Sequence, residues 1–179
     1  GEAYVSTGLF DSEMEVLHDR VPLASVAPLT DREYYARGCT ALLDAIGGAI
    51  HHIGNVHKYA REEDRPEKTI FVITTDGYEN ASRKYSADRV KQMIERQKEK
   101  YGWEFIFLGA NIDAVETAKS FGISEDRAAN YVNDGEGIEV MYSAQCCLMS
   151  DIRRNRVNER SWKSNVEADY MRRGRQNLK

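Results

Sequence analysis

Long hydrophobic runs are missing from this 179-residue chain, since no apolar stretch approaches the roughly 20 residues that a membrane-spanning helix needs. Cysteine is also scarce. The three cysteines are Cys39, Cys146 and Cys147, and an odd number with two adjacent does not resemble a disulfide framework. The sequence runs directly into strand-like residues without a signal peptide pattern. These absences together predict a cytoplasmic protein.

Several motifs that would indicate an enzyme or a zinc site are absent as well. The pair Gly47-Gly48 follows no strand and belongs to neither a dinucleotide-binding nor a P-loop pattern, so we interpret it as allowing a helix to pack closely on a sheet. The histidines at 51, 52 and 57 do not share one helix face, and we expect them to be surface or packing residues. Cys146 and Cys147 lack zinc-site spacing, and we expect both to be buried in a helix.

What the sequence does contain is an alternation of strand-like and helix-like segments. The predicted order begins with an antiparallel hairpin, residues 2–10 and 13–18, and a short helix introduced by the capping box Thr30–Glu33 and ending near Gly38. Helices and buried strands then alternate. The predicted strands are 70–75, 103–108 and 128–132, and the predicted helices start near 40, 86, 113, 138 and 161. This order is typical of an α/β fold with a mostly parallel sheet and helices on both faces.

The charge is unevenly distributed along the chain. Residues 151–179 contain nine Lys and Arg against four Asp and Glu, whereas the chain as a whole has a net charge of −4. We therefore divide the chain into a domain over residues 1–152 and a basic C-terminal helix or tail over residues 153–179. Such a tail is either a solvated segment or a surface for nucleic acid or an acidic partner.

Two oxygen-bearing side chains fall where an α/β sheet gathers its ligands. Asp76 follows the buried strand 70–75, and Thr40 stands at the start of a helix. A carboxylate and a hydroxyl suit Mg²⁺, Mn²⁺ or Ca²⁺ better than zinc. Both also have a structural interpretation, because a threonine can cap its own helix and an aspartate can hydrogen-bond its own turn.

Residues 38–45 (Gly-Cys-Thr-Ala-Leu-Leu-Asp-Ala) and 71–80 (Phe-Val-Ile-Thr-Thr-Asp-Gly-Tyr-Glu-Asn) resemble the second and third pieces of the metal-ion-dependent adhesion site (MIDAS) of von Willebrand factor type A (vWA) domains. The likeness extends to about residue 152 and is greatest to single-domain bacterial and phage members. It implies a Rossmann-like three-layer sandwich whose mostly parallel central sheet has one antiparallel edge strand. It also implies that Thr40 and Asp76 are ligands of Mg²⁺ or Mn²⁺, with Gly38 and Gly77 shaping the loops around them.

The chain departs from the family pattern because the first piece of the site, Asp-x-Ser-x-Ser, occurs nowhere in it. In the family this piece follows the first, central strand, so we expect that strand to be missing from the sheet. Metal binding is then expected to be weak or absent. We also expect either an N-terminally truncated chain or one whose missing strand comes from a partner by strand addition.

The resemblance implies a protein–protein interaction module without enzymatic activity, whose partner completes the metal site with an acidic residue. Two alternatives from other classes stay open. One is a Mg²⁺-dependent α/β phosphohydrolase that uses Asp76, although Tyr78 occupies the position where the haloacid dehalogenase type has a second aspartate. The other is nucleic-acid binding through the basic tail.

Overall fold

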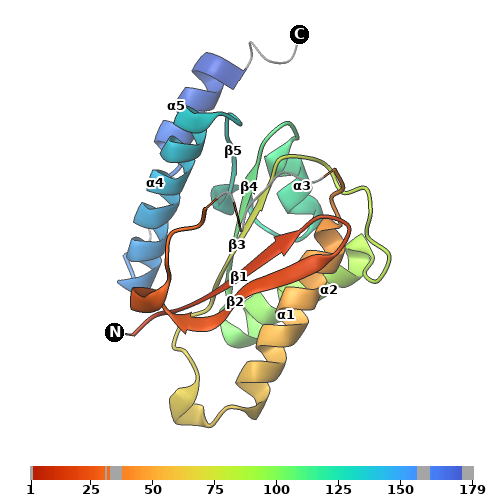
Figure 1. Cartoon of the computed structure of the whole chain (residues 1–179), viewed down its shortest axis with the longest axis vertical. Coiled ribbons are helices and arrows are strands. Elements are labelled where there is room, and N and C mark those ends of the chain that lie inside the picture. The colour runs from red at the N-terminus through yellow and green to blue at the C-terminus, as the bar shows by residue number, and fades with distance from the viewer. Residues whose placement is uncertain (1, 31, 33–37, 157–161, 175–179) are drawn as a thin grey trace. The chain divides into compact units, whose positions relative to one another are not determined.

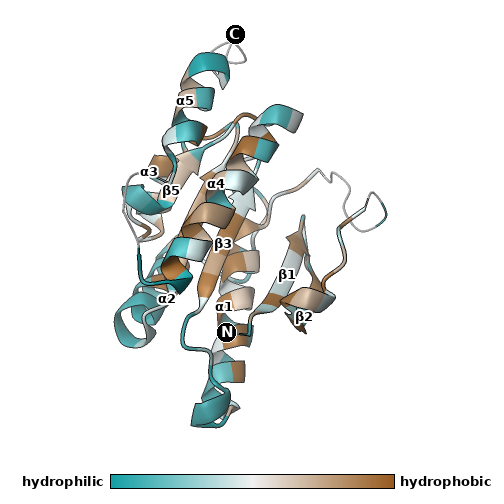
Figure 2. Cartoon of the chain, turned by 90° about the vertical axis from the view of Figure 1, so that its left-hand side faces the viewer, coloured by the Kyte–Doolittle hydropathy of each residue, from teal (hydrophilic) through white to brown (hydrophobic). Residues whose placement is uncertain are grey.

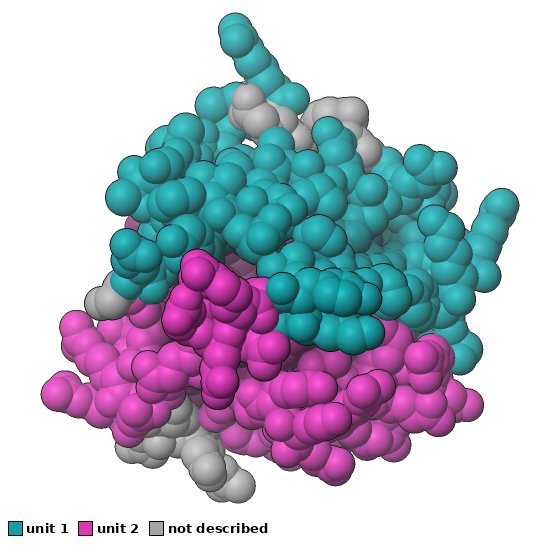
Figure 3. Space-filling view, turned by 90° about the horizontal axis from the view of Figure 1, so that it is seen from below, with its two compact units in different colours: residues 1–59, 78–86 teal, residues 60–77, 87–179 magenta. Residues whose placement is uncertain are grey.

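The computed structural model describes residues 2–30, 32, 38–156 and 162–174 (Figure 1). Its strands form two separate sheets, a two-stranded antiparallel sheet and a three-stranded parallel sheet. The chain divides into two compact units, coloured separately in Figure 3. The first unit contains residues 1–59 and 78–86, and the second contains residues 60–77 and 87–179. No described helix combines the length and the apolar composition required to span a membrane.

The first unit consists of a hairpin, a long helix and a returning loop. Strands β1 (Tyr4–Phe10) and β2 (Met14–Pro22) pair in antiparallel register, as the sequence predicts, although β2 extends further than expected. Asp11 closes the turn, because its carboxylate accepts a hydrogen bond from the backbone N–H of Glu13 at 2.8 Å. Helix α1 (Leu42–Tyr59) confirms the helix predicted after Thr40. The short helix predicted over residues 30–38 falls largely outside the described residues.

The second unit is a parallel sheet with helices packed on it. Its strands lie in the order β3-β4-β5, and both pairs are parallel, which confirms the α/β class. Its main elements are β3 (Ile70–Thr75), α2 (Ala87–Tyr101), β4 (Glu104–Gly109), α3 (Ala114–Ser120), β5 (Ala128–Asn130), α4 (Gly135–Arg153) and α5 (Ser164–Arg173). Figure 2 shows β3 as mainly hydrophobic, whereas α2 presents many hydrophilic residues.

Strand β4 is the centre of the second unit because both of its faces are covered. Ile106 and Leu108 belong to a fully buried cluster with residues of α4 and with Trp162 and Val166. Phe107 points to the opposite face, since side chains alternate along a strand, and its ring lies 6.1 Å from that of Phe121 after α3. This continuous apolar run is the pattern that a central parallel strand requires.

Two expectations about the fold are corrected. The antiparallel strand was expected at the edge of the parallel sheet, but β1 and β2 form a sheet of their own. Cys146 and Cys147 were expected to be buried, yet both are exposed on α4, as is Cys39 in the first unit. Helix α4 buries Met141, Ala144 and Leu148 instead. Cys146 and Cys147 lie two and three residues after Ala144, on a part of the helix that points away from this face. They were predicted to be buried because they are next to the apolar positions in sequence, although they do not share the same helix face.

Candidate functional site

The beginning of helix α1 lacks a capping residue of its own. Ala41 accepts the first helical hydrogen bond, from Ala45, and alanine has no side-chain acceptor for the free N–H groups of the first turn. The loop 78–86 supplies those acceptors from far along the chain. Glu79 accepts from the N–H of Leu43 at 2.8 Å, and the hydroxyl of Ser82 accepts from the N–H of Asp44 at 3.0 Å. The loop therefore caps α1.

Two carboxylates hold this capping loop in a fixed shape. Glu79 also accepts hydrogen bonds from the backbone of Ala81 and from the backbone and hydroxyl of Ser82. Burial on its own would raise the pKa of Glu79, but these donors and the N–H of Leu43 lower it below its ordinary value. The charged form of Glu79 is thus the form that the fold selects, and it lies where the dipole of α1 favours a negative charge.

Asp44, in the first turn of α1, holds the second half of the loop. Its two carboxylate oxygens accept hydrogen bonds from three consecutive backbone N–H groups, those of residues 83, 84 and 85, at 2.8–2.9 Å. Burial would raise the pKa of Asp44, and the three N–H donors more than offset this effect and lower it. The aromatic ring of Tyr85 then lies against Gly47, where an added Cβ would come within 2.5 Å of the ring.

This contact gives one helix glycine a specific reason. Gly47 is needed because the side chain of Tyr85, from the loop 78–86, approaches α1 at that point. At Gly48 the nearest atom to an added Cβ is the sulfur of Met14, at an ordinary van der Waals distance of 3.9 Å. Only the first of the two adjacent glycines is therefore required by close packing.

Thr40 lies immediately before α1 and is held by Asn80. The N–H of Thr40 donates to Oδ1 of Asn80 at 2.9 Å, and the carbonyl of Thr40 accepts from the N–H of Asn80 at 3.0 Å. The hydroxyl of Thr40 has no hydrogen-bond partner among the described residues. Because Glu79 and Ser82 already satisfy the first turn of α1, the hydroxyl of Thr40 is not used as a helix cap.

Asp76 belongs to the second unit and directly follows β3, at the carboxyl end of the parallel sheet. Its side chain is exposed and makes no hydrogen bond or ion pair with the described residues, whereas its main-chain carbonyl accepts from the amide of Asn111 at 3.2 Å. The alternative of an aspartate that bonds its own turn therefore does not apply. The hydroxyl of Thr75 performs that role by donating to the carbonyl of Gly77 at 2.9 Å.

The two glycines predicted to shape the loops show no conformational need for glycine. Neither Gly38 nor Gly77 has a φ in the left-handed region, which the described glycines adopt only at Gly102 and Gly122. An added Cβ at Gly38 would meet no atom within 4 Å.

The donor chemistry of Thr40 and Asp76 fits a hard divalent cation, since both offer an uncommitted oxygen. Thr40 belongs to the first unit and Asp76 to the second. The described part of the chain holds no group of three or more His, Cys, Asp or Glu side chains that could bind a metal. The histidines instead make isolated contacts, such as His52 with Asp19 at 3.0 Å.

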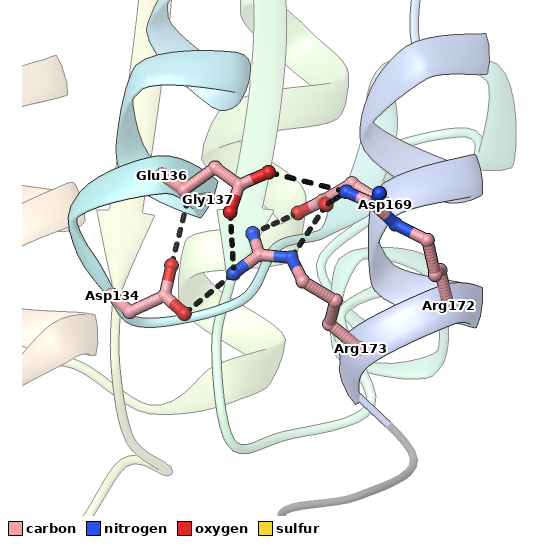
Figure 4. Close-up of polar contacts among 6 residues, drawn as sticks. All are labelled: Asp134, Glu136, Gly137, Asp169, Arg172 and Arg173. Carbon is pink, nitrogen blue, oxygen red and sulfur yellow. Dashed lines mark hydrogen bonds and ion pairs between the residues drawn. The ribbon is translucent and has the colours of Figure 1, made fainter.

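The basic C-terminal segment contains a second charged cluster, drawn in Figure 4. Arg173 of α5 forms ion pairs with the buried carboxylate of Asp169 and, at 2.6 Å, with Asp134. Hydrogen bonds from Arg173 hold the pKa of Asp169 below its ordinary value. Arg172 pairs with Glu136 and Asp169 at 3.1 Å. These two arginines are therefore already neutralised by carboxylates, and they fasten α5 to the start of α4.

Thr40 and Asp76 can be predicted from the sequence, whereas the roles of Asn80, Glu79, Ser82 and Asn111 cannot. Their only local signal is a run of polar residues after a strand, which is equally typical of an unstructured loop. A comparison of the chain with models of known protein families, with characterised proteins and with solved structures finds no match.

Proposed function

We propose that the chain is a protein-binding module of the vWA type, without enzymatic activity, in which Thr40 and Asp76 are the remaining ligands of a weak Mg²⁺ or Mn²⁺ site. The observation that carries this proposal is that the hydroxyl of Thr40 has no hydrogen-bond partner in the described part of the chain. A helix-capping role would explain the threonine without a ligand, but side chains of the 78–86 loop occupy the capping positions. The exposed carboxylate of Asp76, at the carboxyl end of a parallel strand, supports the same interpretation.

A cation held by only two protein oxygens keeps most of its coordination positions open for water or for a partner. Divalent hard cations take six or more oxygen ligands, so a carboxylate from a partner would add strongly to the binding. A bound cation would supply the positive charge for that contact, and Thr40 and Asp76 would be the residues that hold it. Partner affinity should then depend on the metal and on an acidic side chain of the partner.

Titration of the ¹⁵N-labelled protein with Mn²⁺ tests the site, because the paramagnetic ion broadens nearby amide signals even when binding is weak. We expect selective broadening around residues 40 and 76, a dissociation constant weaker than about 0.1 mM, and competition by Mg²⁺. Asp76→Asn should abolish the selective broadening. Uniform broadening, or broadening that Asp76→Asn leaves unchanged, would contradict the proposed site.

A specific observation favours strand addition as a further mode of partner binding. Among the described strands, β3 pairs with β4 alone. The carbonyls of Thr69 and Thr75 accept hydrogen bonds from the chain of β4, so by alternation the backbone groups of residues 70, 72 and 74 point to the other edge. No Pro or Lys within β3 protects that edge.

Amide hydrogen exchange tests the open edge. We expect the amides of Ile70, Val72 and Thr74 to exchange faster than those of Phe71, Ile73 and Thr75 in the isolated protein. A partner that adds a strand should slow the first group selectively. Equal protection of both groups in the isolated protein would show that this edge of β3 is already covered.

A further inference from the structure

Asn80 contacts Thr40 through both of that residue's main-chain polar groups. The pairing at 2.9 and 3.0 Å joins two segments that are 40 residues apart in the sequence. A single hydrogen bond would let Thr40 pivot, whereas two bonds of opposite direction fix both the position and the orientation of its backbone. The hydroxyl is then the only polar group of Thr40 that remains uncommitted among the described residues.

The surroundings of Asn80 are themselves fixed. Its neighbour Glu79 is bonded to the first turn of α1 and to residues 81 and 82, and Asp44 binds the N–H groups of residues 83–85. Asn80 is thus presented by a loop that is anchored on both sides of it. A ligand held by such a second layer of contacts loses little conformational freedom when it binds a metal.

We propose that Asn80 is a positioning residue that holds the hydroxyl of Thr40 ready to coordinate a divalent cation. This inference rests on the proposed function. Asn80 acts through Thr40 and does not itself bind the ion. Removing the side-chain acceptor of Asn80 should therefore weaken the cation site, and it should do so only while the Thr40 hydroxyl is present.

The test is a double-mutant cycle with Mn²⁺ as the probe and amide line broadening as the readout. The variants are Asn80→Ala, Thr40→Val and the double variant, with Asn133→Ala as the control because Asn133 is exposed in the second unit. We expect Asn80→Ala and Thr40→Val each to weaken Mn²⁺ binding about 10-fold or more. The double variant should bind no more weakly than Thr40→Val, and Asn133→Ala should match the wild type.

A conservative variant separates positioning from a general effect on folding. Asn80→Asp keeps an oxygen that can accept the N–H of Thr40, so it should bind Mn²⁺ at least as tightly as the wild type. In Asn80→Ala, hydrogen exchange at the Thr40 amide should accelerate while the Leu43 amide, bonded to Glu79, stays protected. If Asn80→Ala does not fold, Asn80→Ser provides the same comparison with a shorter acceptor.

The outcomes distinguish the failure of this inference from the failure of the proposed function. Wild-type protein that shows no selective Mn²⁺ effect would overturn both. Selective binding that is lost in Thr40→Val but unchanged in Asn80→Ala would overturn the positioning role alone. Strictly additive losses in the double variant, or Asn80→Asp binding as weakly as Asn80→Ala, would also overturn it.

Discussion

The side-chain amide of Asn111 donates a hydrogen bond to the main-chain carbonyl of Asp76, with 3.2 Å between the nitrogen and the oxygen. Asn111 follows β4 and Asp76 follows β3, so this bond joins the ends of two neighbouring parallel strands. Asn111 makes the contact with a φ of 58°, in the left-handed region that asparagine tolerates better than most residues. The chain after Asp76 is therefore held by a residue in an uncommon conformation.

Substitution of Asn111 should separate the effect of this conformation from that of the hydrogen bond. Asn111→Ala loses the donor and places a Cβ in a left-handed residue, so we expect a loss of about 1–2 kcal/mol in the free energy of unfolding. Asn111→Gly loses the same donor without the steric penalty and should cost less. Urea denaturation measures both, and equal losses would show that the conformation contributes nothing.

The adjacent glycines of α1 should respond in opposite directions to alanine. Gly47→Ala drives a methyl group to within 2.5 Å of the Tyr85 ring, so overpacking of about 1–3 kcal/mol should exceed the gain in helix propensity. Gly48→Ala has space and should stabilise the protein by up to about 1 kcal/mol. Thermal unfolding of the two variants measures both effects. Adding Gly47→Ala to a Tyr85→Ala variant should cost less stability than adding it to the wild type, because the clashing ring is then absent.

The carboxylate of Asp44 should prove essential to the loop that caps α1. Asp44→Ala removes the acceptor for three backbone N–H groups, and we expect a loss of about 2 kcal/mol in the free energy of unfolding. Limited proteolysis should then cut within residues 78–86 in the variant before it cuts the wild type. Arg83→Ala is a suitable control because its backbone N–H, which makes the contact, is retained.

The same carboxylates give the protein a defined sensitivity to acid. The pKa values of Asp44 and Glu79 are both lowered in the folded state, so the unfolded chain binds protons at a higher pH than the folded chain does. Their contribution to stability is complete above about pH 5 and is lost as the pH falls below about 4. Denaturation curves across this range should show a shallower decline for the double variant Asp44→Asn, Glu79→Gln.

The cysteines offer a simple check on the exposure of α4. Because Cys39, Cys146 and Cys147 are all exposed and free, all three thiols should react with a water-soluble thiol reagent without denaturant. Counting the labelled thiols by mass spectrometry measures this. Protection of Cys146 and Cys147 until denaturant is added would mean that this face of α4 is covered in solution.

Local patterns were sufficient to predict most elements of the fold. The apolar run Phe105–Leu108 identifies β4, and Asp113 marks the start of α3, where its side chain accepts the N–H of Glu116. The hairpin of β1 and β2 was predicted, but its separation from the parallel sheet was not, because pairing between strands that are distant in sequence leaves no local pattern. The resemblance to vWA domains stays a prediction, as does the metal site.

The candidate site was less predictable for the same physical reason. Thr40 and Asp76 could be selected because a threonine before a helix and an aspartate after a strand are recognisable types of position. The roles of Glu79 and Asn80 depend on partners that lie 36 and 40 residues away. Only the folded structure shows that the Thr40 hydroxyl has no partner among the residues it describes.

The chain passes between its two units after residues 59, 77 and 86, because the capping loop returns to the first unit after β3. A deletion from either terminus therefore cannot yield the first unit alone, because residues 60–77 of the second unit lie between its two parts. A fragment that ends at Tyr59 would retain α1 but lose the Glu79 and Ser82 acceptors for its first turn, and its instability would wrongly suggest that the segment is not a folding unit. Expressing this unit alone calls for an internal deletion of residues 60–77, with a linker long enough to run from the C-terminal end of α1 back to its first turn, a distance of about 27 Å.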